Sequence, residues 1–84
     1  MIYEFGVMSS RYELESDDEI IAKVCMSLYL KTSAPIVIYS PVKTAFKPNE
    51  VLEDNFEYCK DKTEEVIKGI NSIKKYISSK ESVK

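Results

Sequence analysis

The last third of the sequence constrains the fold more than any other part. Residues 51–77, VLEDNFEYCKDKTEEVIKGINSIKKYI, place mainly apolar side chains at alternating steps of four and three residues, which is a heptad seam. The seam consists of Leu52, Phe56, Cys59, Thr63, Val66, Ile70, Ile73 and Ile77. Only Thr63 is polar, so a match over nearly four heptads favours one continuous helix over residues 49–79.

A helix of that length is too long for a domain of this size to cover. About 30 residues at about 1.5 Å each span about 45 Å, whereas a compact chain of 84 residues is only about 30 Å across. Part of the seam then needs apolar cover from elsewhere, and a second copy is the commonest source. We expect a homodimer or higher oligomer, joined by a coiled coil through Leu52, Phe56, Cys59, Val66, Ile70, Ile73 and Ile77.

Two other arrangements fit the same pattern. In the first, the helix breaks near residues 60–63, KDKT, where Asp61 caps a new helix and Glu64 is its capping-box partner. In the second, the helix stays whole and its seam packs against strands of the same chain. A heptad and an amphipathic stripe look alike over short lengths, so spacing alone does not separate these models.

The residues before this segment predict an antiparallel hairpin. Residues 2–8 and 11–15 alternate apolar and polar side chains, which is the period-two pattern of strands. A short polar stretch at Ser9 and Ser10 lies between them. We therefore expect two strands joined by a tight turn.

A helix and a third strand should follow the hairpin. Ser16 and Glu19 have the spacing of a capping box, and apolar residues recur at helical spacing over about residues 17–31. Residues 34–39, APIVIY, form a short apolar run typical of a strand buried on both faces. The helix then crosses over the sheet, and the third strand pairs beside the first to give the order 2-1-3.

The predicted fold is a small α+β domain in ββαβα order, with a three-stranded, mostly antiparallel sheet, a crossover helix and a long C-terminal helix. Residues 1–48 make up the ββαβ domain and its connection, residues 49–79 the long helix, and residues 80–84 a frayed tail. A chain of 84 residues has a small core, which a partner subunit would help to stabilise.

The residue types argue against catalysis. The chain has no histidine, so the commonest acid–base group and the commonest metal ligand are both missing. Neither GxGxxG nor GxxxxGK[ST], the glycine-rich phosphate-binding motifs, occurs. Acidic pairs are present, but they lie where helices begin and complement the helix dipole. We expect no catalytic residue, no metal site, no cofactor and no enzymatic activity.

The two cysteines indicate a reducing compartment. Cys25 and Cys59 lie in apolar stripes without metal-site or redox spacing, and we interpret both as buried free thiols. No secretory leader opens the sequence, and no apolar run approaches the roughly 18–20 residues of a membrane span. We therefore expect a cytoplasmic protein without a membrane partner.

The charge is small but unevenly distributed. The net charge is −2, while residues 60–84 hold seven lysines and four acidic residues. This basic end complements the dipole of the expected helix, so nucleic acid is not the expected partner. Arg11, the only arginine, is followed by Tyr12, and this pair is our candidate site for a small anionic ligand.

These observations predict a small, non-enzymatic, homo-oligomeric regulatory protein that binds another protein and occludes its surface. Inhibitors encoded by viruses and mobile elements have a similar composition. A first alternative is an oligomer that sequesters a small anionic or nucleotide-like ligand at Arg11 and Tyr12. A second is nucleic-acid binding through the lysine-rich C-terminal end, including Lys68, Lys74 and Lys75.

Overall fold

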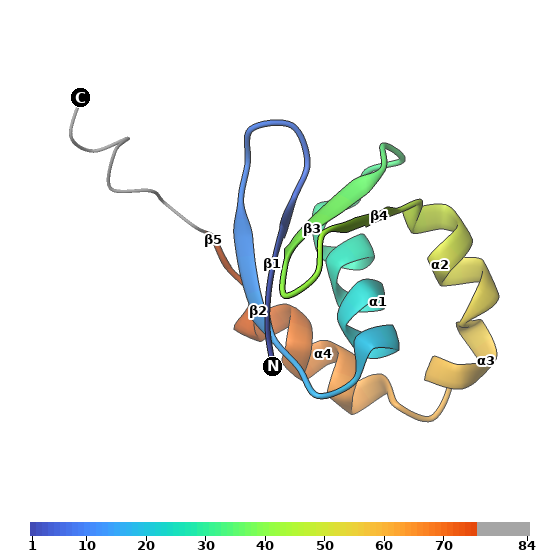
Figure 1. The fold of residues 1–84 in the computed structure, drawn as a ribbon. Helices are drawn as coiled ribbons and strands as arrows, with labels where there is room; N and C mark the ends of the chain where they lie inside the picture. Colours follow the sequence, from blue (N-terminus) through green and yellow to red (C-terminus); the bar gives the residue numbers. More distant parts are fainter. Residues whose placement is uncertain (76–84) are drawn as a thin grey trace.

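The computed structural model describes residues 1–75 and shows an antiparallel sheet with helices on one face (Figure 1). The elements are β1 (Ile2–Gly6), β2 (Tyr12–Glu15), α1 (Glu19–Leu30), β3 (Ile36–Ser40), β4 (Thr44–Phe46), α2 (Pro48–Asp54), α3 (Phe56–Cys59), α4 (Thr63–Ser72) and β5 (Lys74–Lys75). The predicted α+β class is confirmed. None of the helices within these residues is both long and apolar enough to cross a membrane.

The sheet has five strands in the order β4-β3-β1-β2-β5, and all neighbouring strands are antiparallel. The predicted hairpin and the order 2-1-3 are therefore correct, but the predicted three-stranded sheet is not. The two strands that the sequence did not predict are short. Strand β4 has three residues and lies in the expected connection, and β5 has two residues and lies in the expected long helix. Strands this short carry almost no period-two signal.

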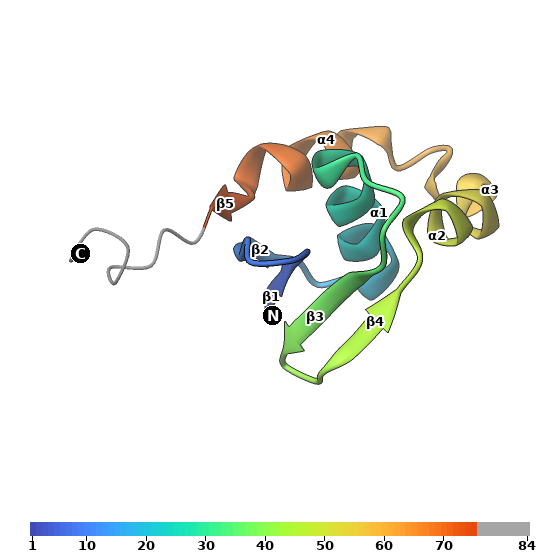
Figure 2. The same ribbon diagram turned by 90° about the horizontal axis from the view of Figure 1, so that it is seen from above.

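The sheet buries only the face that meets the helices. The side chains on this face are Tyr3, Phe5, Leu14, Ile36 and Ile38, all at most 7% exposed. On β3 the intervening residues, Val37 and Tyr39, are only half-buried. The prediction that this strand is buried on both faces is therefore wrong, because no helix of the described chain covers its other side (Figure 2).

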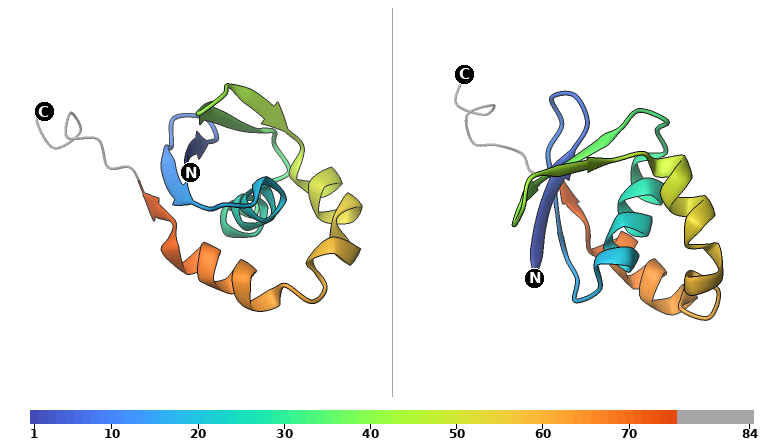
Figure 3. Two further views of the ribbon diagram at one scale, coloured as in Figure 1. Left: turned by 60° about the horizontal axis from the view of Figure 1, so that its bottom comes forward. Right: turned by 45° about the vertical axis from the view of Figure 1, so that its right-hand side comes forward.

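Helix α1 occupies the centre of the molecule. It lies between the sheet and α4 (Figure 2), and an end-on view shows the other elements arranged around it (Figure 3, left). Six of its residues are buried: Ile21, Ala22, Val24, Cys25, Met26 and Ser27. The helix therefore needs apolar cover on more than one side.

Asp18, not Ser16, is the N-cap of α1. The Asp18 Oδ1 atom accepts hydrogen bonds from the backbone N–H groups of Ile20 (2.9 Å) and Ile21 (3.3 Å). The Ser16 Oγ atom accepts one from the N–H of Asp18 (3.1 Å). The predicted capping box is therefore wrong about the capping residue. Aspartate caps a helix as well as serine does, and Asp18 lies nearer the first turn than Ser16.

The predicted long C-terminal helix is wrong. The chain leaves helical geometry at Asn55, with φ −114° and ψ 17°, and again at Lys62, with φ −118° and ψ 27°. The second break agrees with the alternative of a break near residues 60–63, but Lys62 is the N-cap there and no side chain caps α4, so Asp61 is not the cap. Both breaks let short helices turn back over α1, so that Val66 is buried and most of the other described seam residues are partly buried within one chain. The predicted helix beyond residue 75, with Ile77, and the predicted tail lie outside the described residues.

Helix α4 approaches α1 closely at Gly69. A Cβ atom at this position would lie 2.5 Å from Sγ of Cys25. Cys25 is 1% exposed, and its thiol donates a hydrogen bond to the carbonyl oxygen of Val66 (3.3 Å). The sulfur therefore has little room to move aside, and only glycine permits this contact.

We expect Gly69→Ala to lower the free energy of unfolding by about 1–3 kcal/mol, the usual cost of overpacking a core. Alanine in place of glycine at an open helical position has the opposite effect, about 1 kcal/mol of stabilisation. Chemical denaturation of Gly69→Ala, Cys25→Ala and the double variant checks this. In the Cys25→Ala background the substitution at Gly69 should no longer destabilise the protein, and a stabilising single Gly69→Ala variant would contradict the close contact.

Candidate functional site

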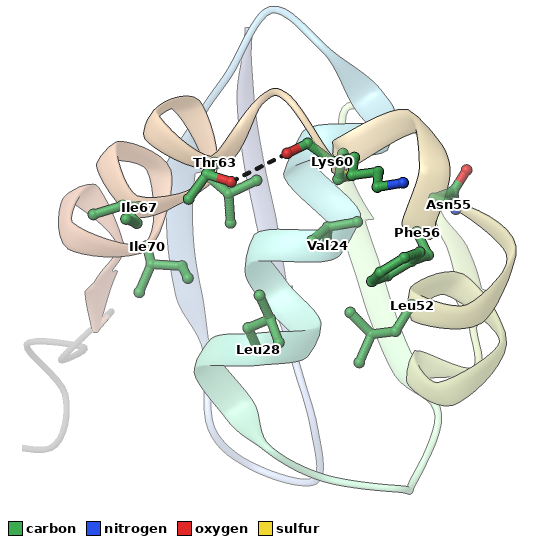
Figure 4. A pocket seen from close by; sticks show the side chains of 11 residues that line it. Val24, Leu28, Leu52, Asn55, Phe56, Lys60, Thr63, Ile67 and Ile70 are labelled. Atoms are coloured by element: carbon green, nitrogen blue, oxygen red, sulfur yellow. Dashed lines mark hydrogen bonds between the residues drawn. The ribbon is translucent and has the colours of Figure 1, made fainter.

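An apolar groove of about 630 Å³ lies among α1, the α2–α3 segment and α4 (Figure 4). We call it the helical groove. Its lining consists of Val24, Leu28, Leu52, Asn55, Phe56, Cys59, Lys60, Thr63, Val66, Ile67 and Ile70. Lys60 is the one charged residue among these eleven, so the interior of the groove is almost entirely uncharged.

Each side of the groove comes from a different helix. Val24 and Leu28 lie one turn apart on α1 and form the floor. Leu52 and Phe56 form one wall, and residues of α4 form the other. The Thr63 hydroxyl donates to the carbonyl oxygen of Lys60 (3.4 Å), which tightens the turn joining the walls.

Large apolar side chains remain exposed along this groove. Phe56 is 64% exposed, Ile67 52% and Leu28 41%. Exposed apolar side chains gathered around one hollow often mark a binding site.

The residues predicted for the oligomer interface gather at this groove. Of the six that the structure describes, five line it: Leu52, Phe56, Cys59, Val66 and Ile70. The sixth, Ile73, packs against the core beyond the end of α4. Sequence reasoning did not include Leu28 and Ile67. Leu28 belongs to the predicted apolar stripe of α1, and Ile67 follows the seam residue Val66 directly. The sequence shows that both are apolar, but it does not show that they lie at the same groove.

A hydrogen bond fixes the wall formed by α3. The Tyr58 hydroxyl donates to Oδ2 of Asp18 (2.5 Å), and the Lys62 ammonium lies 4.2 Å from the centre of the Tyr58 ring. This hydrogen bond, together with the N–H groups of Ile21 and Ile20, holds the pKa of the Asp18 carboxyl below its ordinary value. The same hydrogen bond raises the pKa of Tyr58. Asp18 thus both begins α1 and holds α3 in place.

The structure does not bring Arg11 and Tyr12 together. The Arg11 guanidinium lies 4.0 Å over the Tyr39 ring and 3.5 Å from the Glu4 carboxylate, on the uncovered face of the sheet. Tyr12 faces the helices, where its ring stacks on Phe5 and meets the edge of Tyr29, with centroids 5.6 and 5.5 Å apart. Consecutive side chains of an extended chain point to opposite sides, and Arg11 directly precedes β2, so these two side chains form no common ligand site.

Neither cysteine is placed for nucleophilic chemistry. Both are free thiols; Cys25 is buried and Cys59 half-buried. Burial raises the pKa of Cys25 to about 11 and also raises the pKa of Cys59, so both thiols stay protonated at neutral pH. Within residues 1–75, no three His, Cys, Asp or Glu side chains are grouped so as to hold a metal ion.

Comparisons with protein-family models, with curated protein sequences and with solved structures found no match to this chain. The function proposed below therefore rests on the geometry and chemistry of the helical groove.

We expect Tyr58→Phe to lower the free energy of unfolding at neutral pH. We also expect that free energy to fall less steeply in the variant as the pH is lowered. The pKa of Asp18 is lower in the folded protein than in the unfolded chain, so its ionised form stabilises the fold above the unfolded value of about 4. This contribution is lost as the pH falls through the folded value. Denaturation midpoints measured from neutral pH down to about pH 2 check this.

The matched control is Tyr29→Phe, at a tyrosine of similar exposure that packs on Tyr12. It should keep the acid dependence of the unchanged protein. Identical pH profiles for Tyr58→Phe and the unchanged protein would show that the Tyr58 hydrogen bond does not stabilise the Asp18 carboxylate.

Proposed function

We propose that the protein is a small, non-enzymatic interaction module that takes an amphipathic helix of another protein into the helical groove. The supporting observation is the exposure of Phe56, Ile67 and Leu28 beside a 630 Å³ groove whose lining is almost wholly uncharged. An open trough between two helical walls matches the recognition mode in which a helix lays its apolar face into a groove.

The chemistry of the groove favours binding over catalysis. Aliphatic and aromatic side chains dominate its lining, and the chain has no histidine. Cys59, the thiol in the lining, has a raised pKa. A groove of this kind offers apolar contact area but no side chain suited to moving a proton near neutral pH. The protein would act by occupying a helix that its partner needs, which is regulation by occlusion.

A partner protein fits the groove better than a second copy does. The expectation of a homo-oligomer rested on one long helix, which the chain does not form. Two copies related by a twofold axis would also set one concave surface against another and leave a void between them.

We expect a neutral amphipathic peptide to bind this groove. The probe is a helical peptide with leucine at positions i, i+3, i+4 and i+7 and with alanine and glutamine elsewhere. Titrated into ¹⁵N-labelled protein, it should shift the amide signals of the groove lining, above all those of Phe56 and Ile67. The double variant Phe56→Ser/Ile67→Ser should weaken this binding by at least about tenfold, because it removes two apolar contacts of about 1 kcal/mol or more each.

The matched control is Met8→Ser/Val42→Ser, which removes two exposed apolar side chains from strand-connecting turns far from the groove. Both double variants should unfold at nearly the denaturant concentration of the unchanged protein, because the replaced side chains are more than half exposed. Binding that is equally weakened in both, or absent in the unchanged protein, would rule out the groove as the interaction site.

A further inference from the structure

We propose that the helix taken into the groove is a basic one, with lysine or arginine flanking its apolar anchors. This inference rests on the proposed function and names its partner class. Residues 48–72 comprise the α2–α3 segment, α4 and the turn between them, and these form the two walls. Their seven acidic residues are Glu50, Glu53, Asp54, Glu57, Asp61, Glu64 and Glu65, and their basic residues are Lys60, Lys62 and Lys68.

The walls are thus far more acidic than the chain as a whole. Seven negative and three positive charges leave −4 on residues 48–72, against −2 for the entire sequence. All seven acidic residues are exposed. The excess is therefore concentrated on the elements that enclose the apolar groove.

Two of the three wall lysines already have partners within the walls, and the third, Lys68, lines a different pocket beside the start of α1. Lys60 lies 3.8 Å from the Glu57 carboxylate, and Lys62 lies 3.8 Å from that of Asp61 and also over Tyr58. Within the described part of the chain, the five remaining wall carboxylates form no ion pair. A basic partner would therefore meet negative charge that the protein itself does not neutralise.

The carboxylates stand next to the exposed apolar side chains. Residues three apart on a helix are neighbours on its surface, which places Glu64 beside Ile67 on the α4 wall. Glu57 follows Phe56 directly on the opposite wall. A helix whose anchors enter the groove holds its flanking positions above these walls, within reach of long lysine and arginine side chains.

The same charges argue against the other occupants. A second copy would set walls of −4 against walls of −4, and juxtaposed like charges oppose association. Nucleic-acid phosphates would meet the same repulsion. A basic amphipathic helix is the occupant that matches both the apolar interior and the acidic walls.

The test compares three helical peptides that share the leucine anchors and differ only at the flanking positions, which are glutamine, lysine or glutamate. At low salt the lysine peptide should bind on the order of tenfold more tightly than the glutamine peptide, from a few exposed ion pairs of modest strength each. The glutamate peptide should bind more weakly than the glutamine peptide. The lysine advantage should shrink as salt is raised from about 0.01 M to about 0.5 M, because salt screens exposed charges.

Charge-reversal variants show whether the walls or the whole protein select the peptide. Glu57→Lys/Glu64→Lys changes two exposed wall residues, and the matched control Glu15→Lys/Asp17→Lys makes the same change in net charge beside the start of α1. The wall variant should lose the preference for lysine over glutamate, whereas the control should keep most of it. Equal loss in both variants would overturn the inference, because bulk charge would then explain the preference.

Failure of this inference is distinguishable from failure of the proposed function. If the three peptides bind the groove with equal affinity, the basic partner is wrong while the groove remains a binding site. If the glutamine peptide does not bind, both are wrong. A dimer in light scattering that dissociates in Phe56→Ser/Ile67→Ser would also overturn both, because a second copy would then cover the groove.

Discussion

The arrangement of the molecule depends on α1 being covered from more than one side. The sheet supplies Phe5, Leu14 and two isoleucines of β3 to one side of this helix, and α4 packs Val66 on another. A two-layer α+β domain usually buries one stripe of each helix. Here the central helix has a second apolar side, and the segments after β4 fold back to cover it. The cover is incomplete, and the helical groove is the part of α1 that its own chain leaves open.

Strong local periodicity made half of the fold predictable. The first hairpin, α1 and β3 each show a clear pattern, and their spatial order followed from topology rules. The heptad interpretation was wrong because steps of four and three residues describe which side chains share a helical face, whether the helix is one rod or several pieces. Asn55 and Lys62 interrupt the helix without a glycine or proline to mark the break. What makes these breaks favourable is the uncovered side of α1, which is distant in sequence.

The same distinction applies to the residues predicted for the oligomer interface. Spacing identified Leu52, Phe56, Cys59, Val66 and Ile70 as members of one apolar surface, and they are. It did not identify what that surface faces, because this depends on where the chain turns. Arg11 and Tyr12 do not meet for a related reason: consecutive side chains point to opposite sides where the chain is extended, as it is at the start of β2. The acidity of the walls became meaningful only once the apolar lining between them was located.

One carboxylate links local and tertiary structure in this protein. Oδ1 of Asp18 caps the first turn of α1, while Oδ2 receives the hydroxyl of Tyr58 from α3. A single proton on this group weakens both contacts together. Fraying of the central helix and release of the groove wall should therefore occur as one cooperative opening, and a partner that holds the wall closed would also protect the amides at the start of α1 from hydrogen exchange.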